Sequence, residues 1–173
     1  HFGHTDFILC LGHYGSQIKE YFRNYPWNSS DVTMTFTGEQ NPVFHSKTDI
    51  SMWQVTLADT GLESMTAFRL LKVRRYLRSN ENFLLTYGDG LSTVDLDALI
   101  SEHKAYNRAL TITEVHPTGR FGALSIDEDG SIKDFHEKPQ LENSYVNGGF
   151  MACSHEIFKY LPSNPDVMLE NEP

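Results

Sequence analysis

The chain has 173 residues, enough for one domain with a hydrophobic core of its own, and a formal net charge of -9 at pH 7. The acidic balance argues against a bulk electrostatic attraction for nucleic acid or for an anionic membrane surface, so an anionic ligand would need a local basic cluster. No apolar run approaches the ~18 residues that a membrane-spanning helix needs.

The first half of the chain alternates strand and helix patterns. Strands are indicated by apolar or Val- and Thr-rich runs, and helices by apolar residues spaced three or four apart. In chain order we expect a strand at 6–12, a helix at 16–25, strands at 31–38 and 53–61, and a helix at 64–79. The stretch between the second and third strands, residues 39–52, is expected to be irregular.

The second half begins in the same way and then changes. We expect a strand at 83–87, a helix at 96–107 capped by Asp95, a strand at 109–115, an antiparallel hairpin of 121–127 with 131–138, a strand at 144–153 and a short helix near 155–161. Alternating strands and helices followed by a hairpin predict an α/β fold with a mixed sheet and helices on both faces. Because no linker or repeat interrupts the chain, we expect one domain over residues 1–173.

A single aspartate, Asp89, stands between two glycines just past the expected strand 83–87. In open α/β sheets ligands bind beyond the carboxyl ends of the strands. Gly88 and Gly90 would permit unusual φ values and let a ligand approach the backbone closely. An exposed carboxylate there suits Mg²⁺, which typically takes one or two protein carboxylates plus ligand phosphates. The same three residues also fit an ordinary loop before a capped helix.

Two further groups follow later in the chain, and each has a plain structural explanation as well. Glu137 and Lys138 stand side by side at the end of an expected strand, where the lysine could meet a phosphate and the glutamate could accept from hydroxyl groups. Such a pair is usually a solvated surface pair. Asn147 with two following glycines could belong to a site or to a common hairpin turn.

The stretch "DTGLESMTAFRL" (59–70) joins an expected strand to an expected helix. The strand ends in Thr60 and Gly61 and the helix starts near Ser64, which would leave backbone N–H groups free at the helix N-terminus. A loop of this kind can recognise the edge of a nucleotide base, and it can equally be an ordinary capped turn.

In this order, five stretches resemble the sugar-1-phosphate nucleotidyltransferases, and among them the glucose-1-phosphate cytidylyltransferases: "DTGLESMTAFRL", "TYGDG" (86–90), "GRFGAL" (119–124), "EKP" (137–139) and "VNGGF" (146–150). The resemblance runs over nearly the whole chain. It implies a three-layer, Rossmann-like nucleotidyltransferase fold with a mixed, mainly parallel sheet. It also implies that a sugar-phosphate oxygen attacks the α-phosphorus of CTP with the help of Mg²⁺, giving CDP-glucose for polysaccharide biosynthesis and releasing pyrophosphate.

Matching each position to the family's motifs assigns roles to individual residues. Asp89 and Lys138 would be catalytic, with Asp89 holding Mg²⁺. The nucleotide-binding set would be Thr60, Gly61, Ser64, Arg69 and Gly88. The sugar-phosphate set would be Gly122, Glu137, Lys138, Val146 and Asn147. The partners implied are CTP and glucose 1-phosphate, and we expect a homo-oligomer.

One departure from the family pattern concerns the choice of nucleotide. In "TAFR" (66–69) the cytidylyl relatives tend to carry two glycines before the arginine, and Phe68 adds bulk near the expected base site. Transfer from dTTP or UTP therefore stays open, as does a non-catalytic binding or assembly subunit of the same fold. A phosphorelay receiver domain also places an aspartate at a strand end, but no acidic pair follows strand 6–12.

The cysteines and histidines suggest no further site. Cys10 and Cys153 lie in apolar segments without a short spacing between them, which indicates neither a disulfide framework nor a thiolate metal site and favours a reducing, cytoplasmic setting. The histidines are scattered, and only His1 and His4 have a spacing that suggests metal binding, so none is given a role.

The family's first strand leads into a Gly-Gly-x-Gly-Thr-Arg loop that holds the triphosphate, and a later region supplies a second aspartate for Mg²⁺. Neither occurs in these residues. We therefore expect an internal fragment that lacks the first strand and the C-terminal part, and that is inactive by itself.

Overall fold

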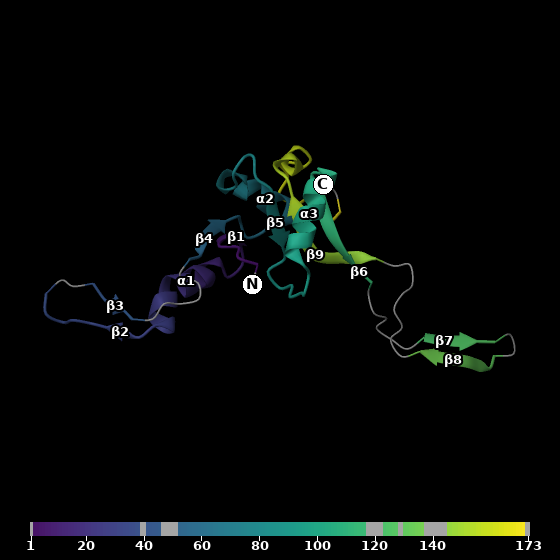
Figure 1. Ribbon diagram of the computed structural model, residues 1–173, viewed down its shortest axis with the longest axis horizontal. Helices are drawn as coiled ribbons and strands as arrows, with labels where there is room; N and C mark the ends of the chain where they lie inside the picture. Colours follow the sequence, from purple (N-terminus) through teal and green to yellow (C-terminus); the bar gives the residue numbers. More distant parts are fainter. Residues whose placement is uncertain are drawn as a thin grey trace. The chain divides into compact units, whose positions relative to one another are not determined.

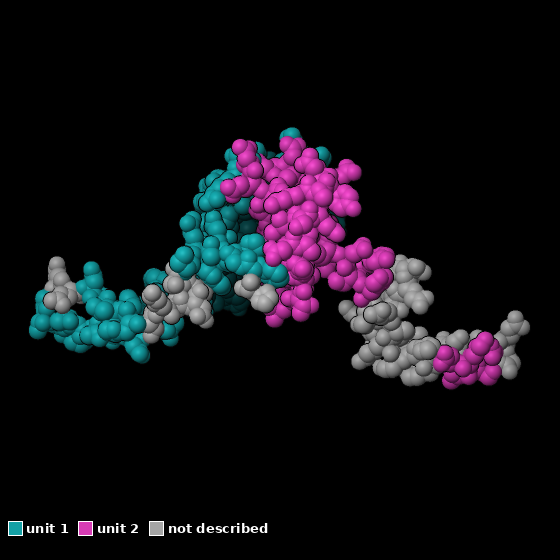
Figure 2. Space-filling view, viewed as in Figure 1, with its two compact units in different colours: residues 1–79, 158–173 teal, residues 80–157 magenta. Residues whose placement is uncertain are grey.

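The computed structural model describes residues 2–38, 41–45, 52–116, 123–127, 130–136 and 145–171. The chain divides into two compact units, residues 1–79 with 158–173 and residues 80–157, which have different colours in Figure 2. Each unit carries strands and helices of its own. Over the described ranges, no helix is both long enough and apolar enough to cross a membrane.

The first unit is built on a parallel pair of strands, each followed by a helix (Figure 1). These elements are β1 (Asp6–Leu11), α1 (Gly15–Ser29), β4 (Gln54–Asp59) and α2 (Thr66–Val73). The pairing runs without interruption from Asp6 opposite Gln54 to Leu11 opposite Asp59. Helix α2 packs against β1 and buries Ala67, Leu70 and Val73. The four expected elements are therefore present, and the two strands end at the same edge.

Two boundaries in this unit differ from the expectation. Helix α1 was expected to end at residue 25, but it continues through Pro26 to Ser29. Helix α2 was expected over 64–79, but it ends at Val73 and passes into a 3₁₀ turn, Arg74–Tyr76. In this turn the guanidinium of Arg74 lies 5.3 Å from the centre of the Phe158 ring. Arg74 therefore makes a cation–π contact from a 3₁₀ turn, at a position where the sequence predicted a continuing α-helix.

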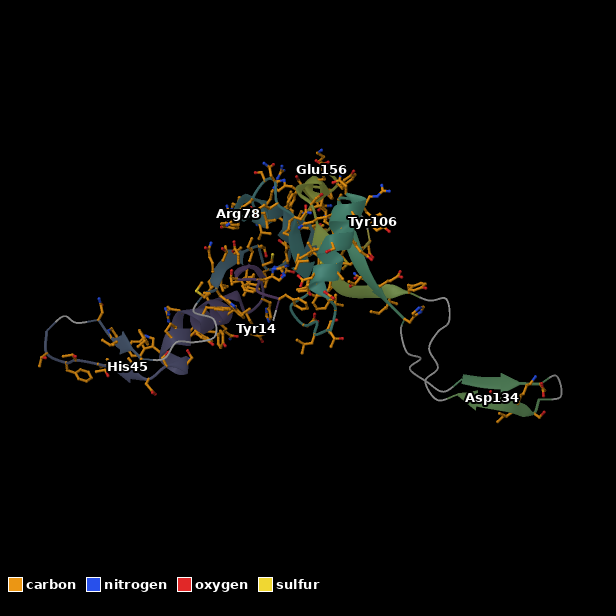
Figure 3. All side chains as sticks on the ribbon, viewed as in Figure 1. Tyr14, His45, Arg78, Tyr106, Asp134 and Glu156 are labelled. Carbon is orange, nitrogen blue, oxygen red and sulfur yellow. The ribbon has the colours of Figure 1, made fainter. Side chains whose placement is uncertain are left out.

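The prediction of a strand over residues 31–38 is mostly wrong. Only Val32–Thr33 (β2) forms a strand, and it pairs antiparallel with Val43–Phe44 (β3), inside the stretch expected to be irregular. Thr33 Oγ1 lies 2.8 Å from Nε2 of His45, which is labelled in Figure 3. Farther along, Met34 and Phe36 are 50% and 88% exposed. An alternating pattern with no covering surface has little to hold it in a sheet, so the strand stops early.

The end of the chain packs on the start of α2. The Met65 N–H donates to the Pro165 carbonyl at 2.8 Å, and the Leu169 N–H donates to Thr66 Oγ1 at 2.8 Å. The Thr66 hydroxyl in turn donates to Glu170 Oε2 at 2.7 Å. Residues 165–170, near the C-terminal end of this unit, thus fix the first turn of the helix.

The second unit contains a three-stranded antiparallel sheet with one helix against it (Figure 1). Its elements are β5 (Phe83–Thr86), α3 (Leu96–Tyr106), β6 (Leu110–Val115) and β9 (Val146–Cys153). Strand β9 lies in the centre, antiparallel to both β5 and β6. Its last three residues, Met151, Ala152 and Cys153, are buried. Helix α3 contacts β6 and β9 and buries Leu99 and His103.

The expected cap of α3 is confirmed. Asp95 Oδ1 accepts from the N–H groups of Asp97 and Ala98, both at 3.0 Å. Farther along the helix, His103 is buried, and its Nδ1 lies 2.8 Å from Thr111 Oγ1 on β6. Both ends of the helix are therefore positioned by polar contacts as well as by the apolar core.

The remaining elements are short. The expected hairpin is present as β7 (Ala123–Ile126) and β8 (Ile132–His136), which pair antiparallel with Ala123 opposite His136. The expected helix near 155–161 is a 3₁₀ helix, His155–Lys159. The α/β class is confirmed. Within the described ranges, however, the only parallel ladder is β1–β4, and the strands fall into separate sheets in which the other pairings are antiparallel.

Candidate functional site

In the first unit, the loop between β4 and α2 is anchored at Thr60. This residue is fully buried, and both its backbone N–H and its hydroxyl donate to the Leu11 carbonyl, at 2.9 and 2.8 Å. Leu11 is the last residue of β1 and Thr60 directly follows β4. The start of the loop is therefore tied to the carboxyl end of the neighbouring parallel strand, which is the usual ligand edge of an α/β sheet.

Gly61 turns the chain immediately after this anchor. Its φ is +100°, and a Cβ at this position would lie 2.7 Å from Ser64 Oγ. The Gly61 N–H donates to Asp59 Oδ1 at 3.1 Å, and the Ser64 hydroxyl donates to the Thr60 carbonyl at 2.7 Å. Both the conformation and the close serine require glycine here. The tight loop holds Thr60, Gly61 and Ser64 together.

Arg69 reaches back from α2 to this loop. Its Nη1 donates to Thr60 Oγ1 at 2.8 Å, and its Nη2 donates to the Leu62 carbonyl at 3.2 Å. The guanidinium also lies against Gly12, where a Cβ would be 2.6 Å from both Nη atoms. Burial raises the pKa of the nearby Cys10 thiol, and the positive charge of Arg69 partly offsets that rise. The four residues expected around the nucleotide in this unit thus form one fixed cationic corner.

The helix N-terminus beside this corner differs from the expectation. The helix begins at Thr66, two residues after Ser64. The Met65 N–H is not free, because it donates to the Pro165 carbonyl. Phe68, which adds bulk in this region of the sequence, lies on α2 with the Lys72 ammonium 5.3 Å from its ring centre. The loop and Arg69, more than the helix terminus, therefore present the polar groups of this unit.

In the second unit, Asp89 is exposed in a turn that follows β5. The turn closes through the Gly90 N–H, which donates to the Tyr87 carbonyl at 3.3 Å. Neither Gly88 nor Gly90 uses the positive φ that glycine permits. At Gly88, however, a Cβ would meet nothing within 4 Å. The carboxylate thus has open space beside it, which fits a position where a ligand can approach.

Val146 and Asn147 lie at the same end of the sheet as this turn. Strand β9 runs antiparallel to β5 with Phe150 opposite Thr86, so the residues before Phe150 lie beyond the carboxyl end of β5. Both Val146 and Asn147 are exposed. Asn147 Nδ2 lies 3.2 Å from Tyr87 Oη, and Asn147 Oδ1 accepts from the Gly149 N–H at 2.8 Å. The second unit therefore brings Gly88, Asp89, Val146 and Asn147 to one edge.

The two glycines after Asn147 form a bulge in β9, and the hairpin-turn alternative is wrong. On β6, Ile112 is opposite Met151 while Glu114 is opposite Asn147, so Thr113 alone spans the extra residues of β9. The Thr113 hydroxyl donates to the Phe150 carbonyl at 2.8 Å and its Oγ1 accepts from the Phe150 N–H at 3.3 Å. A threonine side chain thus replaces the interrupted backbone pairing.

Three of the expected sugar-phosphate residues, Gly122, Glu137 and Lys138, lie outside the described residues. Across the described part of the chain there is no group of three His, Cys, Asp or Glu residues that could hold a metal ion. Asp89 offers one exposed carboxylate, and Mg²⁺ typically takes one or two protein carboxylates when phosphates supply the remaining ligands.

Sequence reasoning missed Gly12, Tyr87 and Thr113 as parts of these two groups. Gly12 ends the run "DFILCLG", and Tyr87 precedes the Gly-Asp-Gly turn, so both stood beside recognised motifs. Neither contact could be seen there, because Arg69 is far from Gly12 along the chain and Asn147 is far from Tyr87. Thr113 had no local signal beyond a strand pattern.

Comparison with known proteins agrees with the resemblance found in the sequence. The family model described as Nucleotidyl transferase matches residues 15–169. The chain is 42% identical over 171 residues to the glucose-1-phosphate cytidylyltransferase of Salmonella typhi. The match covers 99% of this chain and 65% of that relative. It is 40% identical over 174 residues to the protein named "Probable glucose-1-phosphate cytidylyltransferase" of Bacillus subtilis (strain 168), covering 100% of this chain and 66% of that relative. The chain thus spans less than two thirds of the length of these relatives.

A solved structure shows the same fold. The crystal structure of HddC from Yersinia pseudotuberculosis has a TM-score of 0.57 and 18% sequence identity to this chain, covering 98% of this chain and 64% of that one. At this identity the likeness concerns the fold alone. Together with the family match over residues 15–169, it confirms both the expected fold class and the sequence resemblance. The chain belongs to the nucleotidyl transferase family.

Proposed function

We propose that the complete protein transfers a cytidylyl group from CTP to α-D-glucose 1-phosphate, giving CDP-glucose and pyrophosphate for polysaccharide biosynthesis. The observation that carries this proposal is the 40% to 42% identity, over essentially the whole chain, to relatives named as glucose-1-phosphate cytidylyltransferases. Identity at this level over essentially the whole chain favours the same substrates more than a shared fold alone would.

The chemistry of this reaction fits the groups that the two units present. Nucleotidyl transfer needs the reactants in line and their negative charge neutralised, and it needs no covalent enzyme intermediate. In the proposal, the corner of Thr60, Gly61, Ser64 and Arg69 binds the nucleotide. The guanidinium is already held by Thr60 Oγ1 and the Leu62 carbonyl, so little side-chain freedom is lost when a ligand binds.

Asp89 is the proposed ligand of Mg²⁺, and the adjacent Gly88 leaves room for the nucleotide. Support comes from the exposed carboxylate in the turn and from the open space where a Gly88 side chain would be. When bound, Mg²⁺ supplies positive charge that neutralises the phosphates. Lys138, Glu137 and Gly122 are proposed for the sugar phosphate from the family motifs, together with Val146 and Asn147 at the edge of β9.

One residue near the expected base site, Phe68, departs from the pattern of the cytidylyl relatives. A UTP--glucose-1-phosphate uridylyltransferase of Synechocystis is also similar, at 23% identity over 175 residues. The higher identity to the cytidylyl relatives favours CTP. Transfer from dTTP or UTP, and a subunit without catalysis, are the alternatives that the experiment below separates.

Three broader features belong to the same proposal. We take the two units as parts of one nucleotidyltransferase domain over residues 1–173, supported by a family match that extends through both. A cytoplasmic, reducing setting is supported by the free thiols of Cys10 and Cys153. The homo-oligomer expected from the sequence remains part of the proposal.

The test measures pyrophosphate release by the complete protein with glucose 1-phosphate, Mg²⁺ and each of CTP, UTP, dTTP and ATP in turn. We expect CTP to give the highest kcat/KM, by at least about tenfold, which corresponds to about 1.4 kcal/mol of transition-state binding. Reactions without the sugar phosphate are the control. A preference for UTP or dTTP would support the first alternative, and no release with any nucleotide would support the non-catalytic subunit.

A further inference from the structure

The contact between Tyr87 and Asn147 joins the turn that carries Asp89 to the edge of β9. We propose that Tyr87 is a positioning residue, which acts through Asn147 to orient its amide for a hydroxyl group of the sugar phosphate. This inference rests on the proposed function, because Asn147 is assigned to the sugar in that proposal. Tyr87 itself has no assigned role in that proposal, and the inference adds one.

The orientation of the Asn147 amide follows from its two partners. The Gly149 N–H can only donate, so the atom 2.8 Å from it must be the amide oxygen. The amide nitrogen is then the atom 3.2 Å from Tyr87 Oη, to which it donates. Each end of the amide is held by one bond, and an amide has a second N–H and a second lone pair to offer a ligand. A sugar hydroxyl, which both donates and accepts, is the complementary group.

The local backbone is built around this pair. Gly149 has a φ of +80°, and a Cβ there would lie 3.2 Å from Cδ2 of the Tyr87 ring. At Gly148 a Cβ would lie 2.8 Å from Thr113 Oγ1, the atom that pairs with Phe150 across the bulge. The bulge therefore depends on both glycines, and it brings the Gly149 N–H to Asn147 and the Gly149 α-carbon close to the Tyr87 ring.

The ring and the hydroxyl of Tyr87 have separable effects. The ring lies beside Gly149, and a phenylalanine ring would occupy the same place. The hydroxyl is the group that reaches Asn147, so its removal frees one end of the amide without opening a cavity. Tyr87→Phe in the complete protein is therefore the diagnostic change. Tyr106→Phe is the matched control, since Tyr106 (Figure 3) is an exposed tyrosine on α3 in the same unit.

We expect Tyr87→Phe to raise the KM for glucose 1-phosphate about 5- to 10-fold, the size of effect typical of one hydrogen bond, and to change the KM for CTP by less than about twofold. The melting temperature should stay within about 2 °C of the wild-type value, because the exposed bond adds little to stability. Tyr106→Phe should change neither KM. Equal changes in both KM values, or no change in either, would overturn the inference.

A second measurement separates action through Asn147 from a direct effect of the tyrosine. Asn147→Ala should raise the KM for glucose 1-phosphate, and adding Tyr87→Phe to that variant should change it by less than about 1.5-fold, since the partner is already gone. If the double variant instead showed the product of the two single-variant increases in this KM, Tyr87 would not act through Asn147. A wild-type protein without turnover on any nucleotide would refute the proposed function and this inference with it, whereas an active wild type with an unaltered Tyr87→Phe variant would refute the inference alone.

Discussion

The guanidinium of Arg69 lies directly against Gly12, in the space that any larger residue at position 12 would fill. A Cβ there would be 2.6 Å from both Nη atoms and 3.0 Å from Cζ. Gly12 directly follows β1, and Arg69 lies on α2. The contact links the end of a strand to the cation that we propose for the nucleotide, and it makes the glycine a requirement for the position of that cation.

Gly12→Ala should therefore weaken nucleotide binding more than it weakens the fold. The group in the way is the end of a flexible side chain, which can move aside, but it would then give up its bond to Thr60 Oγ1. We expect the KM for CTP to rise on the order of tenfold, as for the loss of a charge-assisted hydrogen bond, while the KM for the sugar phosphate changes little. Steady-state kinetics of the complete protein measures both values.

The control for this prediction is the same substitution in an Arg69→Ala background. With the guanidinium removed, Gly12→Ala has nothing to displace and should leave the KM for CTP of that variant unchanged. A further tenfold rise would mean that position 12 acts on the nucleotide independently of Arg69.

Thr60→Val tests the anchor of the same loop. The substitution keeps the shape of the side chain but removes the hydroxyl that donates to the Leu11 carbonyl and accepts from Arg69. Because the site is fully buried, we expect the free energy of unfolding to fall by roughly 1–3 kcal/mol, measured by urea denaturation. Thr33→Val removes an exposed contact to His45 and should cost about 0.5 kcal/mol or less. Similar losses in the two variants would contradict the role of burial.

The elements that the sequence predicted well are those with local causes. The Asp95 cap needs only an aspartate before a helix. The structure confirms it, because the Asp95 carboxylate accepts from the N–H groups of Asp97 and Ala98. Strands β1 and β4 carry apolar runs that are mostly half-buried, and Leu11 and Ala58 are buried. The prediction of a strand over 31–38 was mostly wrong because an alternating pattern does not by itself supply a surface that covers the apolar side chains. Phe36, for example, is exposed.

The sequence suggested candidate site residues but not the contacts between them. Family motifs indicated Ser64, Arg69, Asp89 and Asn147, and the structure shows how two of them are held: Arg69 against Gly12, and Asn147 against Tyr87. Both pairs join segments far apart in the sequence. No spacing rule connects such residues, so pairings of this kind need coordinates.

His103 should make stability depend on pH. It is 1% exposed, and burial lowers the pKa of His103 below the ordinary value of 6.5. The folded state therefore keeps the neutral imidazole where the unfolded chain binds a proton, so stability should be lost as the pH falls below 6.5 and should be unaffected by this group above it. Urea denaturation at a series of pH values measures the slope.

The matched variants are His103→Gln and His116→Gln. Glutamine cannot titrate, so His103→Gln should lose stability at neutral pH but show a shallower decline in acid than the wild type. His116→Gln replaces an exposed histidine in the same unit and is the control for the substitution itself. An unaltered acid slope in His103→Gln would show that another group carries the pH dependence.

Asp89→Asn tests the proposed metal ligand with the smallest change of shape. The side chain is exposed, so we expect the melting temperature to stay within about 2 °C, while the loss of the negative charge removes the hard ligand that Mg²⁺ needs. The expected result is a fall in kcat of at least about a hundredfold, or about 2.7 kcal/mol at 1.36 kcal/mol per factor of ten, and a higher Mg²⁺ concentration for half-maximal rate.

Asp97→Asn is the control, because it removes an exposed aspartate of the same unit, in the first turn of α3, and should leave both values within about twofold. The Mg²⁺ titration is decisive: if Asp89→Asn lowered kcat with the wild-type Mg²⁺ dependence, the carboxylate would act on the substrates and not through the metal, and if both aspartate variants fell alike, the effect would be one of overall charge.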